Sequence, residues 1–256
     1  MSLLAVHDVT RRFGGLTAVD RVSFDVFEGA ILALIGPNGA GKSTLFNLLT
    51  GFDRADGGTM MFDGRDVARA LPHYVVRLGM ARTFQNTQLF EEMTVLENVL
   101  VGMHVRTRTG VLAAALRLPG TGVEEHVARE EAARLLRLVG LADVAAEPAA
   151  GLPHGSRRLL EVARALATRP RLLLLDEPAA GLNTAETAKL AGVLYAIRDG
   201  GVTLVVVEHD MGLVMEVSDE IIVMDQGRKI ASGPPLLIQK DPAVIEAYLG
   251  EETADA

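Results

Sequence analysis

The chain has 256 residues, of which 49% are hydrophobic and 23% are charged, and its formal net charge is −8. This length allows one large domain or a core with a smaller unit attached, and it is enough to bury about 70% of the unfolded surface. No cysteine is present, which excludes disulfides, thiolate metal sites, iron–sulfur clusters and cysteine nucleophiles. The acidic balance argues against a general nucleic-acid binder, because that class carries an excess of basic residues.

Uninterrupted apolar runs, such as 172–175 and 204–207, are short throughout the chain. A transmembrane helix needs roughly 20 apolar residues. The first residues also lack the basic start and apolar core of a signal peptide. We therefore expect a cytosolic chain that reaches a membrane only by docking onto a partner.

Short strand-like runs bounded by turn residues alternate with helix-like segments along the chain. The expected strands are Leu4–Val9, Val22–Val26, Ile31–Ile35, Thr59–Phe62, Leu172–Leu175, Thr203–Val207 and Ile221–Met224. The expected helices include Ser43–Leu49, Val123–Val139, Arg157–Thr168 and Ala185–Asp199. Several strands are apolar on both faces, which is typical of a parallel sheet. The pattern predicts a single α/β domain over 1–256, with an antiparallel β subdomain near the N-terminus and a helical subdomain at about 90–165.

A glycine-rich segment between an expected strand and an expected helix fits the pattern G-x-x-x-x-G-K-[ST]. It comprises Gly36, Pro37, Asn38, Gly39, Ala40, Gly41, Lys42, Ser43 and Thr44. Glycines let backbone N–H groups turn toward phosphate oxygens, and the following helix N-terminus adds a positive dipole end. Lys42 is expected to reach the β- and γ-phosphates and the Ser43 hydroxyl to bind Mg²⁺. These features predict a P-loop NTPase core.

A second motif places two carboxylates directly after the apolar run 172–175. Asp176 then lies at the carboxyl end of a buried strand, where ligands bind in α/β folds. An aspartate there can hold Mg²⁺, and Glu177 beside it can polarise an attacking water. Together with the phosphate loop, this pair predicts a nucleoside triphosphatase.

Three further segments follow in a characteristic order. Gln85 lies 43 residues after Lys42, the segment Leu152–Ser156 ends 20 residues before Asp176, and His209 lies 32 residues after Glu177. This order and spacing resembles the ATP-binding cassette ATPases over essentially the whole chain. The resemblance implies an ATPase that binds ATP and Mg²⁺ and works as a dimer with a second cassette subunit.

The resemblance also implies roles for individual residues. Phe13 would stack on adenine, Gln85 would complete the Mg²⁺ shell and sense the γ-phosphate, and His209 would contact the γ-phosphate. Asn183 falls in the loop that crosses the dimer interface in this family. The segment with Leu152, Pro153, Gly155 and Ser156 would open a helix toward ATP bound by the opposite subunit.

Within the family, the chain resembles one branch, the ATP-binding subunits of branched-chain amino-acid importers. These importers have two types of cassette, and the chain resembles the longer one. The resemblance rests on the segments Ala81–Asn86, Leu89–Phe90, Met93–Val99, Asp176–Asn183 and Val244–Gly250 and on an insert near 104–122. It implies permease subunits that dock near Gln85–Val99, an indirect link to a solute-binding protein, no nucleic-acid partner and a peripheral place on the cytoplasmic face of the membrane. The apolar residues Leu89, Phe90 and Met93 lie in this segment, and they are expected to face the permease.

The signature segment departs from the family form Leu-Ser-x-Gly-Gln. Pro153 replaces the small or hydroxyl residue, and Ser156 stands where glutamine is expected. The change raises the question of how well this chain activates ATP held by its partner. Alternatives from the same residues are a related urea or amide importer, a cassette ATPase outside transport and a regulatory subunit without turnover. A small-molecule kinase shares the phosphate loop but needs neither the signature segment nor His209.

Overall fold

The computed structural model describes residues 2–85, 88–104 and 121–252. The strands are β1 (Ser2–Phe13), β2 (Leu16–Phe27), β3 (Ile31–Ile35), β4 (Gly57–Phe62), β5 (Arg65–Asp66), β6 (Met80–Arg82), β7 (Leu172–Asp176), β8 (Thr203–Val207), β9 (Glu220–Asp225) and β10 (Arg228–Gly233). The helices are α1 (Lys42–Leu49), α2 (Pro72–Leu78), α3 (Val95–Met103), α5 (Thr121–Leu138), α6 (His154–Leu166), α7 (Thr184–Asp199), α8 (Met211–Val217), α9 (Pro235–Ile238) and α10 (Pro242–Glu252). Short 3-10 turns occur at Ala142–Val144 and Ala149–Gly151.

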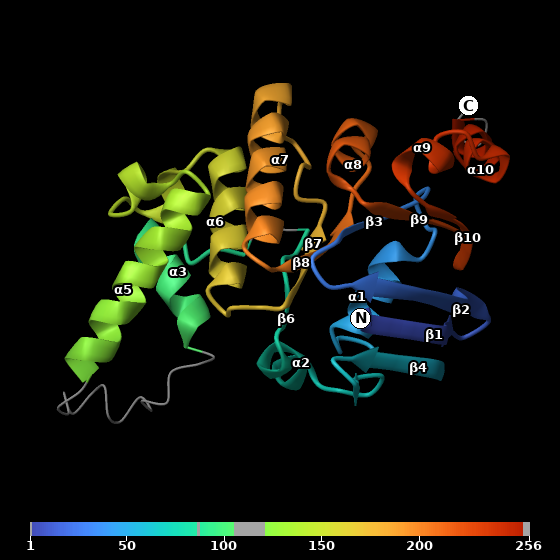
Figure 1. Cartoon of the computed structure of the whole chain (residues 1–256), viewed down its shortest axis with the longest axis horizontal. Coiled ribbons are helices and arrows are strands. Elements are labelled where there is room, and N and C mark those ends of the chain that lie inside the picture. The colour runs from blue at the N-terminus through green and yellow to red at the C-terminus, as the bar shows by residue number, and fades with distance from the viewer. Residues whose placement is uncertain (1, 86–87, 105–120, 253–256) are drawn as a thin grey trace.

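The strands form two sheets (Figure 1). The four-stranded sheet has the order β2-β1-β4-β5 and is antiparallel. The six-stranded sheet has the order β10-β9-β3-β8-β7-β6, and every pair in it is parallel except β9 with β10. The α/β fold with an antiparallel β part, predicted from the sequence, is therefore confirmed.

Each expected strand and helix is present, but several bounds differ from the prediction. β1 and β2 each have 12 residues and extend well beyond 4–9 and 22–26, because they pair as one long hairpin with several register shifts. α6 begins at His154 rather than Arg157, so Gly155 and Ser156 lie inside the helix. The structure also contains elements that were not predicted individually from the sequence, namely β5, β6, β10, α2, α3, α8, α9 and α10. The expected insert near 104–122 lies largely outside the described residues.

The central strands separate two hydrophobic clusters because successive side chains of a strand point to opposite faces. In β7, Leu172 and Leu174 join the cluster that contains α1 and the antiparallel sheet. Leu173 and Leu175 join the cluster of α3, α5, α6 and α7 on the other face. All four leucines are fully buried. This two-sided burial explains the uninterrupted apolar run and places Asp176 where the strand leaves the core.

The helices α3 and α6 approach each other closely at one glycine. A Cβ atom on Gly102 would lie 2.2 Å from the Arg164 carbonyl oxygen and 2.9 Å from the Ala167 Cβ. The first neighbour is a backbone atom and the second belongs to a buried core residue, so moving either one would cost free energy. Within the part of the chain that the structure describes, no helix is both long and apolar enough to cross a bilayer.

Replacing Gly102 with alanine should therefore destabilise the fold by about 1–3 kcal/mol, the usual cost of overpacking a core. Gly192 is the matched control, since it lies inside α7 and a Cβ added there would meet nothing within 4 Å. Gly192→Ala should be neutral or stabilising by up to about 1 kcal/mol, because alanine is the better helix former. Urea unfolding of both variants measures the difference, and equal midpoints would contradict the close approach.

Candidate functional site

The phosphate loop connects β3 to α1, and two of its glycines are required by close backbone contacts. Gly36 has φ +146°, and a Cβ there would lie 2.0 Å from the Met224 carbonyl oxygen. Gly41 has φ +96°, and its Cβ would lie 2.3 Å from the Ala18 carbonyl oxygen. Any side chain at either position would push the loop away from the sheet. The sequence predicts that glycines here let backbone N–H groups face phosphate. Two of these glycines are also required because the loop passes so close to other backbone atoms.

The start of α1 is arranged to receive an anion. Gly41 is its N-cap in a left-handed conformation, no side chain caps it, and no acidic residue stands in its first turn. The first N–H groups of a helix lack intrahelical acceptors and carry the positive end of the dipole. Lys42 lies with its Nζ 2.5 Å from the Gly36 carbonyl oxygen and 2.8 Å from that of Pro37. Its ammonium group is thus held inside the loop.

A cleft of about 720 Å³ brings together many of the residues predicted to bind nucleotide. Its lining includes Phe13, the run Asn38–Thr44, Gln85 and Glu177. Residues that the sequence analysis did not single out complete it: Leu16, Thr17, Ala18, Gln226 and Gly227. The backbone N–H of Gly227 bonds the Ala40 carbonyl, so the β9–β10 turn supports the loop.

Phe13 stands at the rim of this cleft with 48% of its surface exposed, and it does not belong to the core. The guanidinium of Arg11 lies 4.5 Å from the centre of its ring. Such a cation–π contact holds an exposed aromatic ring in place. The position at the rim suits stacking on a flat ligand.

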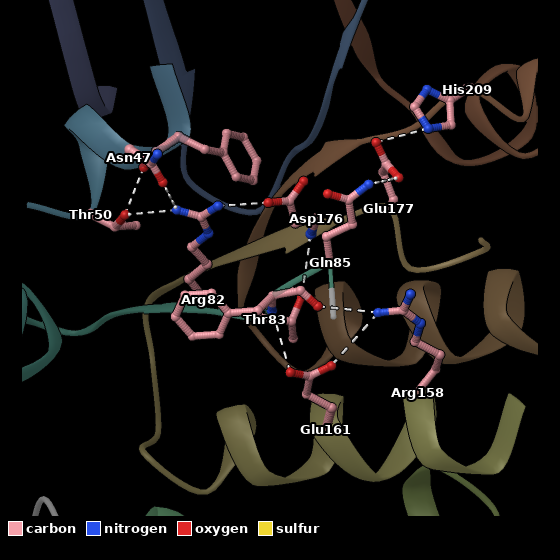
Figure 2. A network of polar contacts seen from close by, with 12 residues as sticks. Asn47, Thr50, Arg82, Thr83, Gln85, Arg158, Glu161, Asp176, Glu177 and His209 are labelled. Atoms are coloured by element: carbon pink, nitrogen blue, oxygen red, sulfur yellow. Dashed lines mark hydrogen bonds and ion pairs between the residues drawn. The ribbon is translucent and has the colours of Figure 1, made fainter. Parts of the chain in front are cut away.

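Gln85, Glu177 and His209 meet at the edge of the parallel sheet (Figure 2). The Nε2 of Gln85 donates to Glu177 Oε2 over 2.9 Å, and His209 Nε2 lies 2.9 Å from Glu177 Oε1. Glu177 has φ +49°, a left-handed conformation that is uncommon outside glycine. Strained residues of this kind gather at functional sites. The predicted γ-phosphate contacts therefore surround the predicted base.

Asp176 lies beside this group but faces an arginine that the sequence analysis did not recognise as functional (Figure 2). Arg82 Nη2 lies 2.6 Å from Asp176 Oδ2, and the two side chains are only 8% and 5% exposed. The same guanidinium donates to Asn47 Oδ1 at 2.7 Å and to Thr50 Oγ1 at 3.3 Å. Arg82 thus joins β6, β7 and α1 at one point.

The residues Ser43, Asn47 and Thr50 share one face of α1, because they follow each other at intervals of four and three residues. Arg82 therefore connects Asp176 to the face of the helix that carries the Ser43 hydroxyl. Within the described residues no three His, Asp or Glu side chains cluster as an all-protein metal site. Ser43, Gln85 and Asp176 nevertheless offer the oxygen donors that Mg²⁺ prefers, and such sites use few protein ligands plus phosphates. The donor set fits Mg²⁺.

Two more buried carboxylates support the segments around the site. Glu161 and Glu208 are only 3% and 2% exposed. Burial raises the pKa of each, against the lowering effect of backbone N–H donors. Glu208 accepts from the Ala179 N–H at 2.5 Å and so ties the end of β8 to the loop after Glu177. A charged residue in an apolar helix face, as at Glu161, was a usable but unrecognised signal.

The predicted signature residues lie apart from the cleft, at the start of α6. Pro153 is the N-cap, with φ −56° and ψ 156° and no side-chain hydrogen bond to the helix. Leu152 is buried, and a Cβ on Gly155 would lie 2.7 Å from Glu186 Oε1. The start of α6 therefore packs against the start of α7. Asn183 caps α7 by accepting from the N–H groups of Ala185 and Glu186.

Comparison with known proteins places this geometry in a family. A family model described as ABC transporter matches residues 19–180. A second model, described as branched-chain amino acid ATP-binding cassette transporter, matches residues 228–254. The two matches together include the phosphate loop, the carboxylate pair and the C-terminal segment that begins with β10.

Individual proteins are similar to the chain over nearly its whole length. The chain is 46% identical to the high-affinity branched-chain amino acid transport ATP-binding protein BraF of Pseudomonas aeruginosa, over 97% of this chain and 98% of BraF. It is 44% identical to the protein LivG of Escherichia coli K12, which has the same description, with the same coverage. An ATP-binding cassette of an ABC transporter in its ADP conformation has a TM-score of 0.86 and 33% identity, covering 98% of this chain and 99% of that one. A nucleotide-free cassette has a TM-score of 0.82 and 32% identity, covering 97% and 99%.

The Arg82–Asp176 ion pair gives a stability prediction. Arg82→Met removes one partner and leaves a buried carboxylate without its cation, which typically costs about 3–5 kcal/mol. Arg21→Met is the matched control, because Arg21 pairs with Asp20 at 3.4 Å but is 71% exposed. The control should change stability by no more than about 0.5 kcal/mol. Urea unfolding compares the two, and similar midpoints would show that Asp176 does not need Arg82.

Proposed function

The chain belongs to the ABC transporter family, and from this premise we propose that it is the ATPase subunit of an importer for branched-chain amino acids. ABC ATPases couple ATP hydrolysis to transport. The named relatives at 44–46% identity, described as branched-chain amino acid transport proteins, support this substrate class. The second family match at 228–254 supports it independently of the phosphate loop.

The observation that carries the proposal is the meeting of Gln85, Glu177 and His209 beside the phosphate loop. Glu177 accepts a proton from the attacking water as general base. His209 and Gln85 keep its carboxylate oriented, since each lies 2.9 Å from one of its oxygens. In this proposal the same two side chains exchange these contacts for the γ-phosphate when ATP binds.

ATP is held by groups that come from three parts of the chain. Backbone N–H groups of the phosphate loop and the start of α1 surround the phosphates, and Lys42 adds the positive charge. Phe13 stacks on adenine at the rim of the cleft. Mg²⁺, held by Ser43, Gln85 and Asp176, would neutralise charge on the β- and γ-phosphate oxygens.

The start of α6 is proposed to meet ATP held by a second cassette subunit. Its first N–H groups have no side-chain cap from Pro153, so they can face a γ-phosphate across the dimer. Gly155 and Ser156 lie in this first turn, while Leu152 anchors the segment. The chain itself would then form one domain, with a helical subdomain at about 90–165 that presents this turn.

The permease is proposed to dock near Gln85–Val99, on the cytoplasmic face of the membrane. Phe90 and Met93 are 47% and 38% exposed there. Leu89 instead packs partly against the core, so Phe90 is the stronger candidate for the contact. Asn98 is fully buried and bonds both backbone groups of Phe90 at 3.0 Å, which fixes the backbone at this position. A solute-binding protein would act through the permease, and no nucleic acid takes part.

Glu177→Gln tests the function directly. The amide keeps the shape and one acceptor oxygen but cannot take up a proton, so turnover should fall at least about 100-fold. ATP binding should stay close to that of the wild type, because the phosphate loop is unchanged. Phosphate release and titration with a fluorescent ATP analogue measure the two properties. Near-normal turnover in this variant would remove Glu177 from the proposed role.

Lys42→Ala serves as the positive control for the same assays. It removes the ammonium held between the carbonyls of Gly36 and Pro37, so it should abolish both binding and turnover. Undiminished ATP affinity in this variant would contradict the nucleotide site itself.

The altered signature should limit turnover in a dimer of two identical chains. Pro153 supplies neither a hydroxyl nor an N–H, so two possible hydrogen bonds to a γ-phosphate are missing, and each charge-assisted one is worth about 10- to 150-fold in rate. Pro153→Ser combined with Ser156→Gln should therefore raise the ATPase rate of the isolated chain. Pro153→Ala with the same second change restores the N–H without the hydroxyl and is the matched control. An unchanged rate in the first double variant would contradict the proposed contact.

A further inference from the structure

Two charged side chains of α6 are buried beneath the loop that carries Gln85 (Figure 2). Glu161, 3% exposed, accepts a long hydrogen bond of 3.4 Å from the Phe84 N–H. It also accepts from the backbone N–H of Gln88. Arg158, 8% exposed, donates from Nη1 to the Phe84 carbonyl oxygen at 3.1 Å. Backbone groups on both sides of Gln85 are thus bonded to one helix.

Fold stability alone gives little reason for this arrangement. The nearest cations to Glu161 are Arg158 and Arg164, each with a nitrogen 3.9 Å from a carboxylate oxygen, which is longer than a charge-assisted hydrogen bond. A buried ion pair is often no more stable than apolar residues of the same volume. Unlike an apolar residue, Glu161 accepts hydrogen bonds from two backbone N–H groups of the loop.

We infer that Glu161 and Arg158 are positioning residues for Gln85, which they act on by holding the peptide groups that flank it. The inference rests on the proposed ATPase function. Gln85 reaches Glu177 over 2.9 Å, and a displacement of the loop by about 1 Å is enough to lose such a contact and much of the rate. Neither positioning residue touches the reacting atoms.

The same helix begins with the turn proposed to face the partner's ATP. Seven residues separate His154 from Glu161, a rise of about 10 Å along α6. The turn proposed to meet the partner's ATP and the side chain that holds Phe84 and Gln88 therefore lie on one helix. Within one chain, the contact to the partner's nucleotide is therefore connected to the side chain that senses its own.

Amide hydrogen exchange of the nucleotide-free chain tests the clamp without any turnover. Glu161→Leu keeps a similar volume but offers no acceptor, so exchange at Phe84 and Gln88 should accelerate by about tenfold or more. Glu161→Gln retains an acceptor oxygen and should keep most of the protection. Arg157→Met is the matched control on the same helix, because Arg157 pairs with Glu91 and not with Phe84. Thermal unfolding of each variant confirms that it is folded.

A double-mutant cycle with Gln85→Ala then tests whether Glu161 acts through Gln85. Glu161→Leu should lower kcat by about 10- to 100-fold with KM for ATP changed by less than about threefold, and Glu161→Gln should restore most of the rate. In the Gln85→Ala background the same substitution should have almost no further effect. If Glu161→Leu does not fold, Arg158→Met replaces it in the same cycle.

The outcomes separate this inference from the proposed function. Unchanged exchange at both amides in Glu161→Leu, or additive rate losses in the cycle, would overturn the positioning role while leaving the ATPase intact. A wild-type chain without ATPase activity, also when assembled with its permease, would overturn the proposed function; the exchange data would still decide whether the clamp exists.

Discussion

Arg82 and Asp176 form an ion pair that is almost fully withdrawn from water, with 2.6 Å between Nη2 and Oδ2. Because the same guanidinium also bonds Asn47 and Thr50, the end of β7 is held against α1. The helix that starts at the phosphate loop and the strand that ends at the carboxylates therefore keep one relative position. Such a contact is costly to bury and costly to break, so it specifies geometry more than it adds stability.

The functional groups converge because parallel strands end at the same edge of a sheet. Glu177 follows β7 and His209 follows β8, while Gln85 comes three residues after β6. The left-handed backbone at Glu177 turns its carboxylate toward both neighbours. A buried carboxylate at Glu208 then stabilises the loop that leaves this point. The strain at one residue is thus offset by hydrogen bonds from the segments around it.

The phosphate loop and the end of β7 could be predicted because their signals are local: glycines before a helix, and an apolar run before Asp176. The roles of Arg82 and Glu161 could not, because their partners lie 94 and 77 residues away in the chain. The charge of Arg82 looks like that of any solvated residue until the fold buries it, and the apolar helix face around Glu161 indicates burial but not which loop the carboxylate holds. The extent of β1 and β2 was also underestimated, since pairing across the hairpin extends strands through polar residues. Local patterns thus predict the ligand-binding loop, while the supports beneath it depend on contacts between distant segments.

The order of strands in the large sheet has a consequence for how the protein is made. β3 leads into the phosphate loop early in the chain, yet its neighbours in the sheet are β8 and β9, which are synthesised about 170 to 190 residues later. The turn that bonds Ala40 follows β9, near the C-terminal end. While the ribosome is still translating the middle of the chain, the first strand of the core has two unsatisfied edges, which are prone to aberrant pairing. The cleft thus matures only at the end of synthesis, so a prematurely terminated chain carries the motif without the pocket.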